Sequence, residues 1–137
     1  MYKLRYILLC IALLGFSCKR EKLDDQQFVQ KYLIGKWNTP FYVKIDLKNG
    51  DTLKKDTVKF KPADTIFFTP SQKFVKHNDS IGFQIDAAGE NITFMTNPDS
   101  TWYIPYVRTT YFKLIHSRKV VSGNDTFYYS IEQQFYR

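Results

Sequence analysis

Apolar and polar residues alternate along most of the chain after Gly35, and this period of two predicts β-strands with one buried face. The alternation first appears over 41–47, and it is longest over 110–121 and 126–136. Asn49-Gly50 is a strong signal for a tight hairpin between the first two strands. We expect eight or nine antiparallel strands, and their regular spacing is typical of a sandwich or a barrel.

Prolines divide this β-rich region further. Pro62 is predicted to end the strand that passes through Phe60, so that 66–68 forms a separate strand. Pro105 restricts the strand through Trp102 to a sheet edge or a bulge, because proline cannot donate a ladder hydrogen bond.

Residues 24–34 have helical spacing instead. Asp24 or Asp25 can cap the start of this helix, and Gly35 can end it. Four apolar side chains at spacings of three and four residues share one face of it: Phe28, Val29, Tyr32 and Leu33. We therefore expect one short helix before the strands.

The first seventeen residues have the layout of a secretory signal. Lys3 and Arg5 form a short basic segment, and an apolar run over 6–16 follows it. As a helix this run spans only ~16 Å, which is too short to cross a bilayer core of ~30 Å. The segment is therefore predicted to direct export and to be removed.

The residues after that run carry a second signal. Leu13-Leu14-Gly15-Phe16-Ser17-Cys18 resembles the lipobox of bacterial lipoproteins, although Gly15 and Phe16 depart from the usual residues. The resemblance implies cleavage before Cys18 and acylation of this cysteine, with palmitate-type chains that hold the protein on a membrane. Cys10 would be discarded with the signal, so the mature chain would keep one cysteine, which has no disulfide partner. The alternative is an ordinary signal peptide that leaves Cys18 as a free thiol.

Processing changes the charge that the composition suggests. The 137-residue chain has a net charge of +7, and loss of Lys3 and Arg5 with no acidic residue lowers this by two. The densest basic region, 44–61, is interrupted by aspartates and contains no continuous basic run. We expect a solvated sheet face and no nucleic-acid partner. The chain length excludes a multidomain enzyme.

Gly35-Lys36-Trp37 lies after the predicted helix and opens the first strand. This arrangement resembles the lipocalin superfamily and, together with Leu33 and Ile34, the small lipocalin-like lipoproteins of Bacteroidota. The resemblance implies an all-β fold, a small up-and-down antiparallel barrel of about eight strands with one short N-terminal helix. It also implies that Trp37 closes one barrel end beneath a basic side chain, for which Arg137 and Arg118 are the candidates. The alternative is that Trp37 is a core residue of an unrelated β-sandwich.

These patterns divide the chain into three parts. Residues 1–17 form the lipoprotein signal peptide, 18–26 the lipidated cysteine and its tether, and 27–137 the lipocalin-like barrel domain. We expect the outer membrane as the location, by lipid anchoring, with the protein facing the periplasm or the cell surface. Both orientations stay open.

No residue pattern points to catalysis, and we expect no enzyme, no metal site and no cofactor. His77 and His116 lie in different predicted strands, and the chain has no paired Cys or His motif at metal-ligand spacing.

Two binding functions remain. The first is a small apolar ligand held inside the barrel, where the candidate interior residues are Phe41, Val43, Phe83, Phe94, Trp102 and Phe127. The second is a filled barrel that docks an envelope protein of the outer membrane through exposed aromatic residues, for which the candidates are Tyr103, Tyr106, Tyr128 and Tyr136.

Six of the ten aspartates are followed by serine or threonine. Five of these pairs continue into triplets that resemble the acceptor of Bacteroidota periplasmic O-glycosylation, and their hydroxyl residues are Thr52, Thr57, Thr65, Ser80 and Ser100. The alternative is structural, because aspartate favours turns and threonine favours the strands that follow them.

Overall fold

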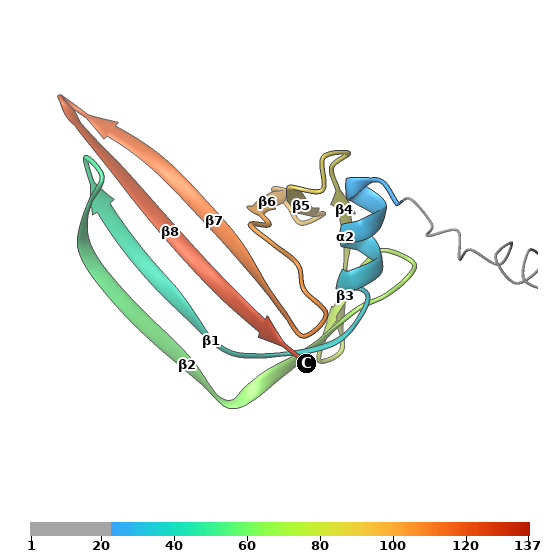
Figure 1. The fold of residues 1–137 in the computed structure, drawn as a ribbon. Helices are drawn as coiled ribbons and strands as arrows, with labels where there is room; N and C mark the ends of the chain where they lie inside the picture. The colour runs from blue at the N-terminus through green and yellow to red at the C-terminus, as the bar shows by residue number, and fades with distance from the viewer. Residues whose placement is uncertain (1–22) are drawn as a thin grey trace, which may run out of the picture.

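The computed structural model describes residues 23–137 as one helix followed by eight strands (Figure 1). The predicted signal peptide over 1–17 and the predicted lipidation site at Cys18 lie outside the described residues. The elements are α2 (Asp25–Leu33), β1 (Gly35–Lys48), β2 (Asp51–Phe68), β3 (Lys73–Lys76), β4 (Asp79–Ile85), β5 (Asn91–Phe94), β6 (Ser100–Tyr103), β7 (Tyr111–Ser122) and β8 (Asp125–Tyr136).

The strands form a closed antiparallel barrel in sequence order, in which β8 returns to pair with β1. This is the fold predicted from the sequence, and it is confirmed. The predicted Asn49-Gly50 hairpin joins β1 to β2, and both residues have positive φ angles, as a two-residue turn of this kind requires.

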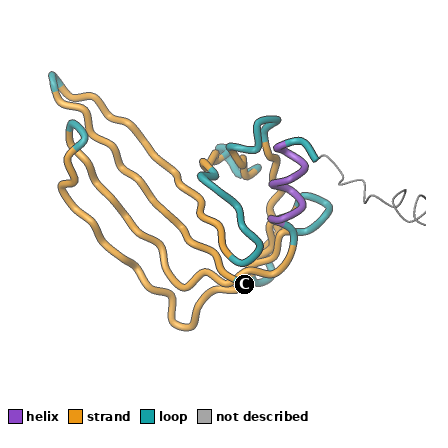
Figure 2. The backbone as a smooth tube through the Cα atoms, in the orientation of Figure 1, coloured by secondary structure: helices purple, strands orange, loops and turns teal. Residues whose placement is uncertain are grey.

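The barrel is strongly asymmetric, because β1, β2, β7 and β8 are much longer than the other four strands. β3 pairs only with 66–68 of β2, and β6 pairs with β7 only between Tyr103 and Ile115. The long strands therefore continue beyond the closed barrel as a four-stranded sheet in the order β2-β1-β8-β7 (Figures 1 and 2). We call this extension, residues 42–60 and 115–132, the wing.

The wing has two distinct faces, which follow from the strand register. Tyr42 lies opposite Gln133, which lies opposite Leu114, and Leu114 is buried in the barrel core. These residues define the inner face, which is continuous with the barrel interior. The neighbouring row, which includes Val43 and Glu132, points to the outer face.

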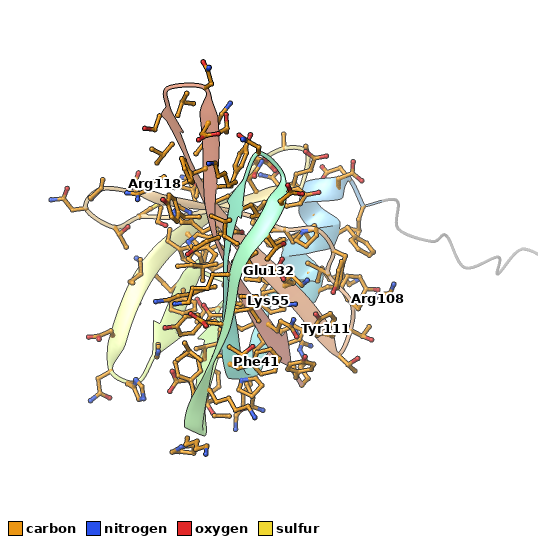
Figure 3. All side chains as sticks on the ribbon, turned by 90° about the vertical axis from the view of Figure 1, so that its left-hand side faces the viewer. Phe41, Lys55, Arg108, Tyr111, Arg118 and Glu132 are labelled. Atoms are coloured by element: carbon orange, nitrogen blue, oxygen red, sulfur yellow. The ribbon has the colours of Figure 1, made fainter. Side chains whose placement is uncertain are left out.

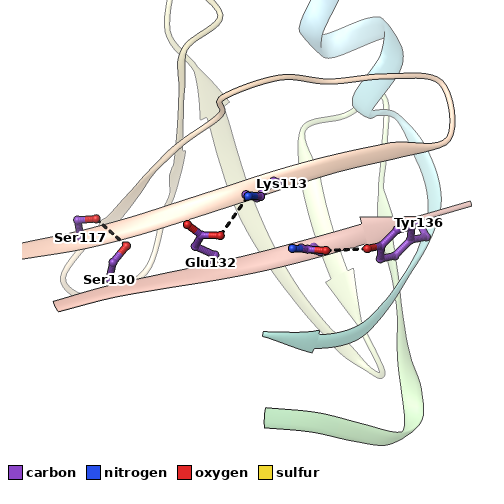
Figure 4. Close-up of polar contacts among 6 residues, drawn as sticks. Lys113, Ser117, Ser130, Glu132 and Tyr136 are labelled. Carbon is purple, nitrogen blue, oxygen red and sulfur yellow. Dashed lines mark hydrogen bonds and ion pairs between the residues drawn. The ribbon is translucent and has the colours of Figure 1, made fainter. Parts of the chain in front are cut away.

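Polar pairs across β7 and β8 mark the outer face. Lys113 pairs with Glu132 at 3.0 Å, and the Ser117 and Ser130 hydroxyls lie 2.9 Å apart (Figure 4). The strand register also places Glu132 and Lys55, both labelled in Figure 3, on this outer face.

Helix α2 forms where the sequence predicts it. The Asp24 carboxylate accepts a hydrogen bond from the Gln27 backbone N–H at 2.7 Å, and the Gln27 side chain accepts one from the Asp24 N–H at 3.3 Å. This capping box satisfies two of the free N–H groups at the helix start. Val29 and Leu33 of the predicted apolar face are buried, whereas Phe28 is 44% exposed.

The prediction that Pro62 separates two strands was wrong, since β2 is continuous from Asp51 to Phe68. Its pairing with β1 shifts here, because Lys59 lies opposite Phe41 whereas Asp64 lies opposite Thr39. Residues 60–63 of β2 therefore face the single residue Pro40 of β1. Pro62 lies within this irregularity, where it interrupts no ladder hydrogen bond. The strand bends sharply without ending.

Aromatic rings fill the barrel near its helix-bearing end. Phe68 makes edge-to-face contacts with Phe83 at 5.3 Å and with Phe112 at 5.8 Å between ring centroids. Phe112 stacks on Phe135 at 4.3 Å, and Trp37 packs edge-on against Phe112 at 4.6 Å. All five rings are 1% exposed or less, so this end of the barrel has a solid core.

Arg137 closes this end from outside. Its guanidinium lies 4.0 Å from the centroid of Trp37 and donates hydrogen bonds from Nη2 to the carbonyl oxygens of Tyr32 and Ile34 at 2.8 and 2.7 Å. Gly35 passes directly beneath with a φ of 126°, and a Cβ there would lie 3.3 Å from Nη2. Arg137 therefore has the predicted position over Trp37, whereas Arg118 lies over Tyr129 in the wing.

We expect Arg137→Ala to lower the free energy of unfolding by about 2–4 kcal/mol, because it removes a cation–π contact and two charge-assisted hydrogen bonds. Arg108→Ala is the matched control, since exposed Arg108 only lies over Tyr106, and it should cost less than about 0.5 kcal/mol. Urea unfolding followed by tryptophan fluorescence measures both. Equal midpoints for the two variants would contradict the role given to Arg137.

Candidate functional site

A cavity of about 220 Å³ opens at the end of the barrel opposite the solid core, where the wing begins. Six strands, β3 to β8, or the turns between them contribute to its walls. It is lined by Phe74, Ile81, Phe94, Thr96, Ser100, Trp102, Leu114, Gln133 and Phe135. The walls are mostly apolar. The volume is below the range of about 300–1,000 Å³ that is typical of pockets for drug-sized ligands, so the cavity holds only a short chain or one end of a longer molecule.

Three polar side chains lie among these apolar walls. Ser100 Oγ accepts a hydrogen bond from Trp102 Nε1 at 2.9 Å, which fixes the indole plane at the cavity wall. Gln133 Nε2 donates to the hydroxyl of the fully buried Thr39 at 3.3 Å. Thr96 donates to the carbonyl of Pro98 at 2.7 Å at the cavity rim. The cavity thus combines an apolar interior with a few fixed polar groups, as binding sites for small molecules commonly do.

A second hollow, of about 400 Å³, lies on the inner face of the wing. Its lining is Lys44, Asp46, His116, Arg118, Tyr129, Ser130 and Ile131. We call it the wing groove. His116 links it to the cavity, because its ring lies 5.1 Å from Trp102 and its Nδ1 lies 2.9 Å from the carbonyl oxygen of Thr101.

The structure places the predicted interior residues in different regions. Phe94 and Trp102 line the cavity. Phe83 lies in the solid core, 5.3 Å from Phe68. Phe127 lies at the far end of the inner wing face, where Lys48 Nζ is 5.7 Å from its ring. Only two of the six residues therefore meet at the cavity.

Phe41 and Val43 lie on the outer face and do not line the cavity. The register of β1 shifts at Pro40, so Trp37 and Thr39 point inward before the shift, and Tyr42 points inward after it. Simple alternation from Trp37 carries Phe41 and Val43 to the wrong face. Val43 is only 7% exposed, yet it does not belong to the core cluster.

Several cavity residues were not predicted from the sequence. Leu114, Gln133 and Phe135 lie on the two long final strands, over 110–121 and 126–136, where alternation was predicted and where Phe127 and Phe135 share one face of the last strand. Gln133 lies in the same row and is its polar residue. A polar side chain in a row that faces the barrel interior was the sequence signal that could have identified Gln133 as a cavity residue.

The predicted docking tyrosines are all exposed, but they do not form one patch. Tyr106 and Tyr136 both lie beside Tyr111. The ring centroid of Tyr111 is 5.4 Å from that of Tyr106 and 4.9 Å from that of Tyr136. Burial and then the hydrogen bond with Tyr106 raise the pKa of Tyr111 above its usual range, so the hydroxyl stays neutral. Tyr128 lies on the outer wing face, and Tyr103 lies beside α2 in a groove lined by Phe28.

The predicted glycosylation residues differ in accessibility. Thr52, Thr57 and Ser80 are exposed. Thr65 is half-buried and its hydroxyl donates to Asn38 at 3.1 Å, while Ser100 lines the cavity. The three exposed hydroxyls are the ones that a transferase could reach in the folded protein.

Within residues 23–137 no cluster of three or more metal-ligating side chains is present. The same described part of the chain holds no helix with the length and apolar character of a membrane span. Neither a protein-family model nor a curated protein matches the chain.

We expect O-glycosylation at one or more of Thr52, Thr57 and Ser80 when the protein is made by its natural host. The intact mass of the natively expressed protein should then exceed that of the acylated chain by the mass of a glycan. Replacement of these three residues by alanine should remove the excess. A native mass equal to that of the unmodified acylated chain would refute the prediction.

Proposed function

We propose that this protein is a lipid-anchored lipoprotein of the bacterial envelope whose barrel binds a small apolar ligand. The observation that carries the proposal is the apolar cavity at the barrel mouth. Its walls come from six strands whose closed pairing holds them in place. Trp102 and Phe94, both expected from the sequence to contact a ligand, lie in these walls.

The filled core at the opposite end supports this assignment by restricting where a ligand can bind. Phe68, Phe112 and Phe135 occupy the barrel axis beneath the cavity, so a ligand enters from the mouth and stops at these rings. Burial of a short alkyl chain there stabilises the complex by about 0.8 kcal/mol for each CH₂ group removed from water.

Binding of decanol tests the cavity directly. The titration should change tryptophan emission, because Trp102 lines the cavity while Trp37 is sealed in the core. Thr96→Trp adds a bulky ring at the cavity rim and should weaken decanol binding at least about tenfold by occupying its volume. Organic extraction of the natively purified protein, followed by mass spectrometry, should identify the bound molecule.

Thr109→Trp is the matched control, because Thr109 is exposed and does not line the cavity. It introduces the same side chain away from the cavity and should leave the decanol affinity unchanged. Binding that is insensitive to Thr96→Trp, or no binding at all together with a ligand-free native extract, would overturn the proposal.

The second candidate is a module that docks an outer-membrane protein, and the wing favours it. Exposed apolar side chains lie on the wing, among them Leu53, Val121 and Tyr128. Surfaces of this kind on a folded domain commonly mark interaction sites. This candidate would replace the first if the cavity takes up no apolar molecule.

The lipid anchor is tested at Cys18. Cys18→Ser removes the acylated thiol, and we expect the variant to lose its attachment to membranes and to keep an uncleaved signal. Cell fractionation and intact mass measure both effects. Cys10→Ser is the matched control, since Cys10 lies inside the predicted signal and should leave processing unchanged. Membrane attachment of the Cys18→Ser variant in cleaved form would contradict acylation at this residue.

A further inference from the structure

The cavity and the wing groove lie in one line along the same two strands. Leu114 and Gln133 line the cavity, and the inner-face residues two positions further along β7 and β8, His116 and Ile131, line the groove. Arg118 follows after another two positions, so about 13 Å of strand separate its Cα from that of Leu114. One elongated ligand can therefore reach both hollows.

The groove differs from the cavity in its charges. Lys44 enters it from β1 and Arg118 from β7, and in the described chain neither forms an ion pair with a carboxylate. The neighbouring inner-face lysines are already paired, Lys48 with Asp125 and Lys54 with Asp56, each at 2.8 Å. Lys44 and Arg118 thus hold their charge on a shared face without a carboxylate partner, and Lys44 Nζ lies 5.7 Å from the centroid of the Tyr42 ring.

Apolar surface lies between these two cations. Ile131 is opposite Lys44 across β1 and β8, and Tyr129 is opposite Arg118 across β7 and β8. Arg118 lies over the Tyr129 ring at 5.4 Å. Asp46 is the acidic residue of the groove lining, and it lies opposite Tyr129 on β1.

We propose that the cavity and the wing groove form a single site for an anionic amphiphile, with the alkyl chain in the cavity and the anionic head between Lys44 and Arg118. This inference rests on the proposed apolar-ligand function and adds the chemical class of the ligand. The head lies over Ile131 and Tyr129, and the chain passes Trp102 to reach the phenylalanine rings. A carboxylate and a phosphate monoester share the chemistry that the two cations recognise.

Ligands with one chain and different heads test the proposal. Tryptophan emission of the full-length protein is followed during titration with decanoate, decyl phosphate, decanol and decylamine. Decanoate or decyl phosphate should bind about three- to tenfold more tightly than decanol, because the two cations attract an anionic head and water screens part of that attraction. Decylamine should bind more weakly than decanol, because the same cations repel its ammonium group. The preference should shrink as the salt concentration rises. Comparison of the two anions identifies which head the groove favours.

Variants assign the preference to residues. Lys44→Gln and Arg118→Gln should each reduce the affinity for the anionic ligand about threefold and leave decanol unchanged. Asp46→Asn should increase it by a similar factor, because it removes the carboxylate from the groove. Lys55→Gln and Lys119→Gln are the matched controls, since the same charge is lost from the outer face of the wing, and both should bind like the unmodified protein.

The outcomes separate the two proposals. If no ligand of the series binds, the apolar-ligand function itself fails. If decanol and decanoate bind equally well, and the Lys44 and Arg118 variants change neither, the cavity binds ligand but the anionic site is refuted. Competition by inorganic phosphate at the affinity of decyl phosphate would also refute it, since the site would then bind a free anion without using the cavity.

Discussion

The contact between Arg137 and Trp37 is the interaction on which the closed end of the barrel depends. The Trp37 indole donates to the carbonyl of Leu33 at 2.7 Å, and Arg137 binds the carbonyls of Tyr32 and Ile34. Three carbonyl groups at the end of α2 are thus satisfied by side chains of β1 and of the residue after β8. The first and last strands are held beneath the helix, and these are the strands whose pairing closes the barrel.

This closure determines where a ligand can bind. With Trp37 covered by Arg137, the adjoining interior is occupied by stacked and edge-to-face phenylalanine rings that are 1% exposed or less. In the described part of the chain, the cavity lies next to this core, where Leu114, Gln133 and Phe135 meet the residues of the short strands. The cavity is therefore at the mouth, beside the inner face of the wing, and its position is a consequence of packing at the other end.

Much of the fold could be predicted because local signals agree with the final structure. Asn49-Gly50 has the residues that a tight hairpin needs, and Asp24 with Gln27 forms a helix cap. Gly35-x-Trp37 correctly indicated the barrel end and its basic cover. The site was harder to predict, because alternation identifies a face only while the register is regular. Phe41 and Val43 were assigned to the interior because they belong to the apolar row of 41–47, but after the register shift at Pro40 this row faces outward and Tyr42 faces inward.

The wing extends past the closed barrel, so β2 and β7 have unpaired edges there that strands of other molecules could join. The free edge of β2 carries Lys55, Lys59 and Lys61 together with Pro62, and that of β7 carries Arg118 and Lys119. Lysine, arginine and proline at such edges oppose the addition of another strand.

Because charged residues and Pro62 oppose strand addition at these edges, the inner wing face can stay uncovered beside the cavity. A barrel with eight equally long strands would enclose this surface, and a ligand would need to lose all contact with water. Here the short strands β3 to β6 end at the cavity rim, while β1 carries Lys44 and Asp46, and β7 carries Arg118, beyond it. The difference in strand length therefore places an apolar enclosure and a charged, hydrated surface next to each other on one continuous face.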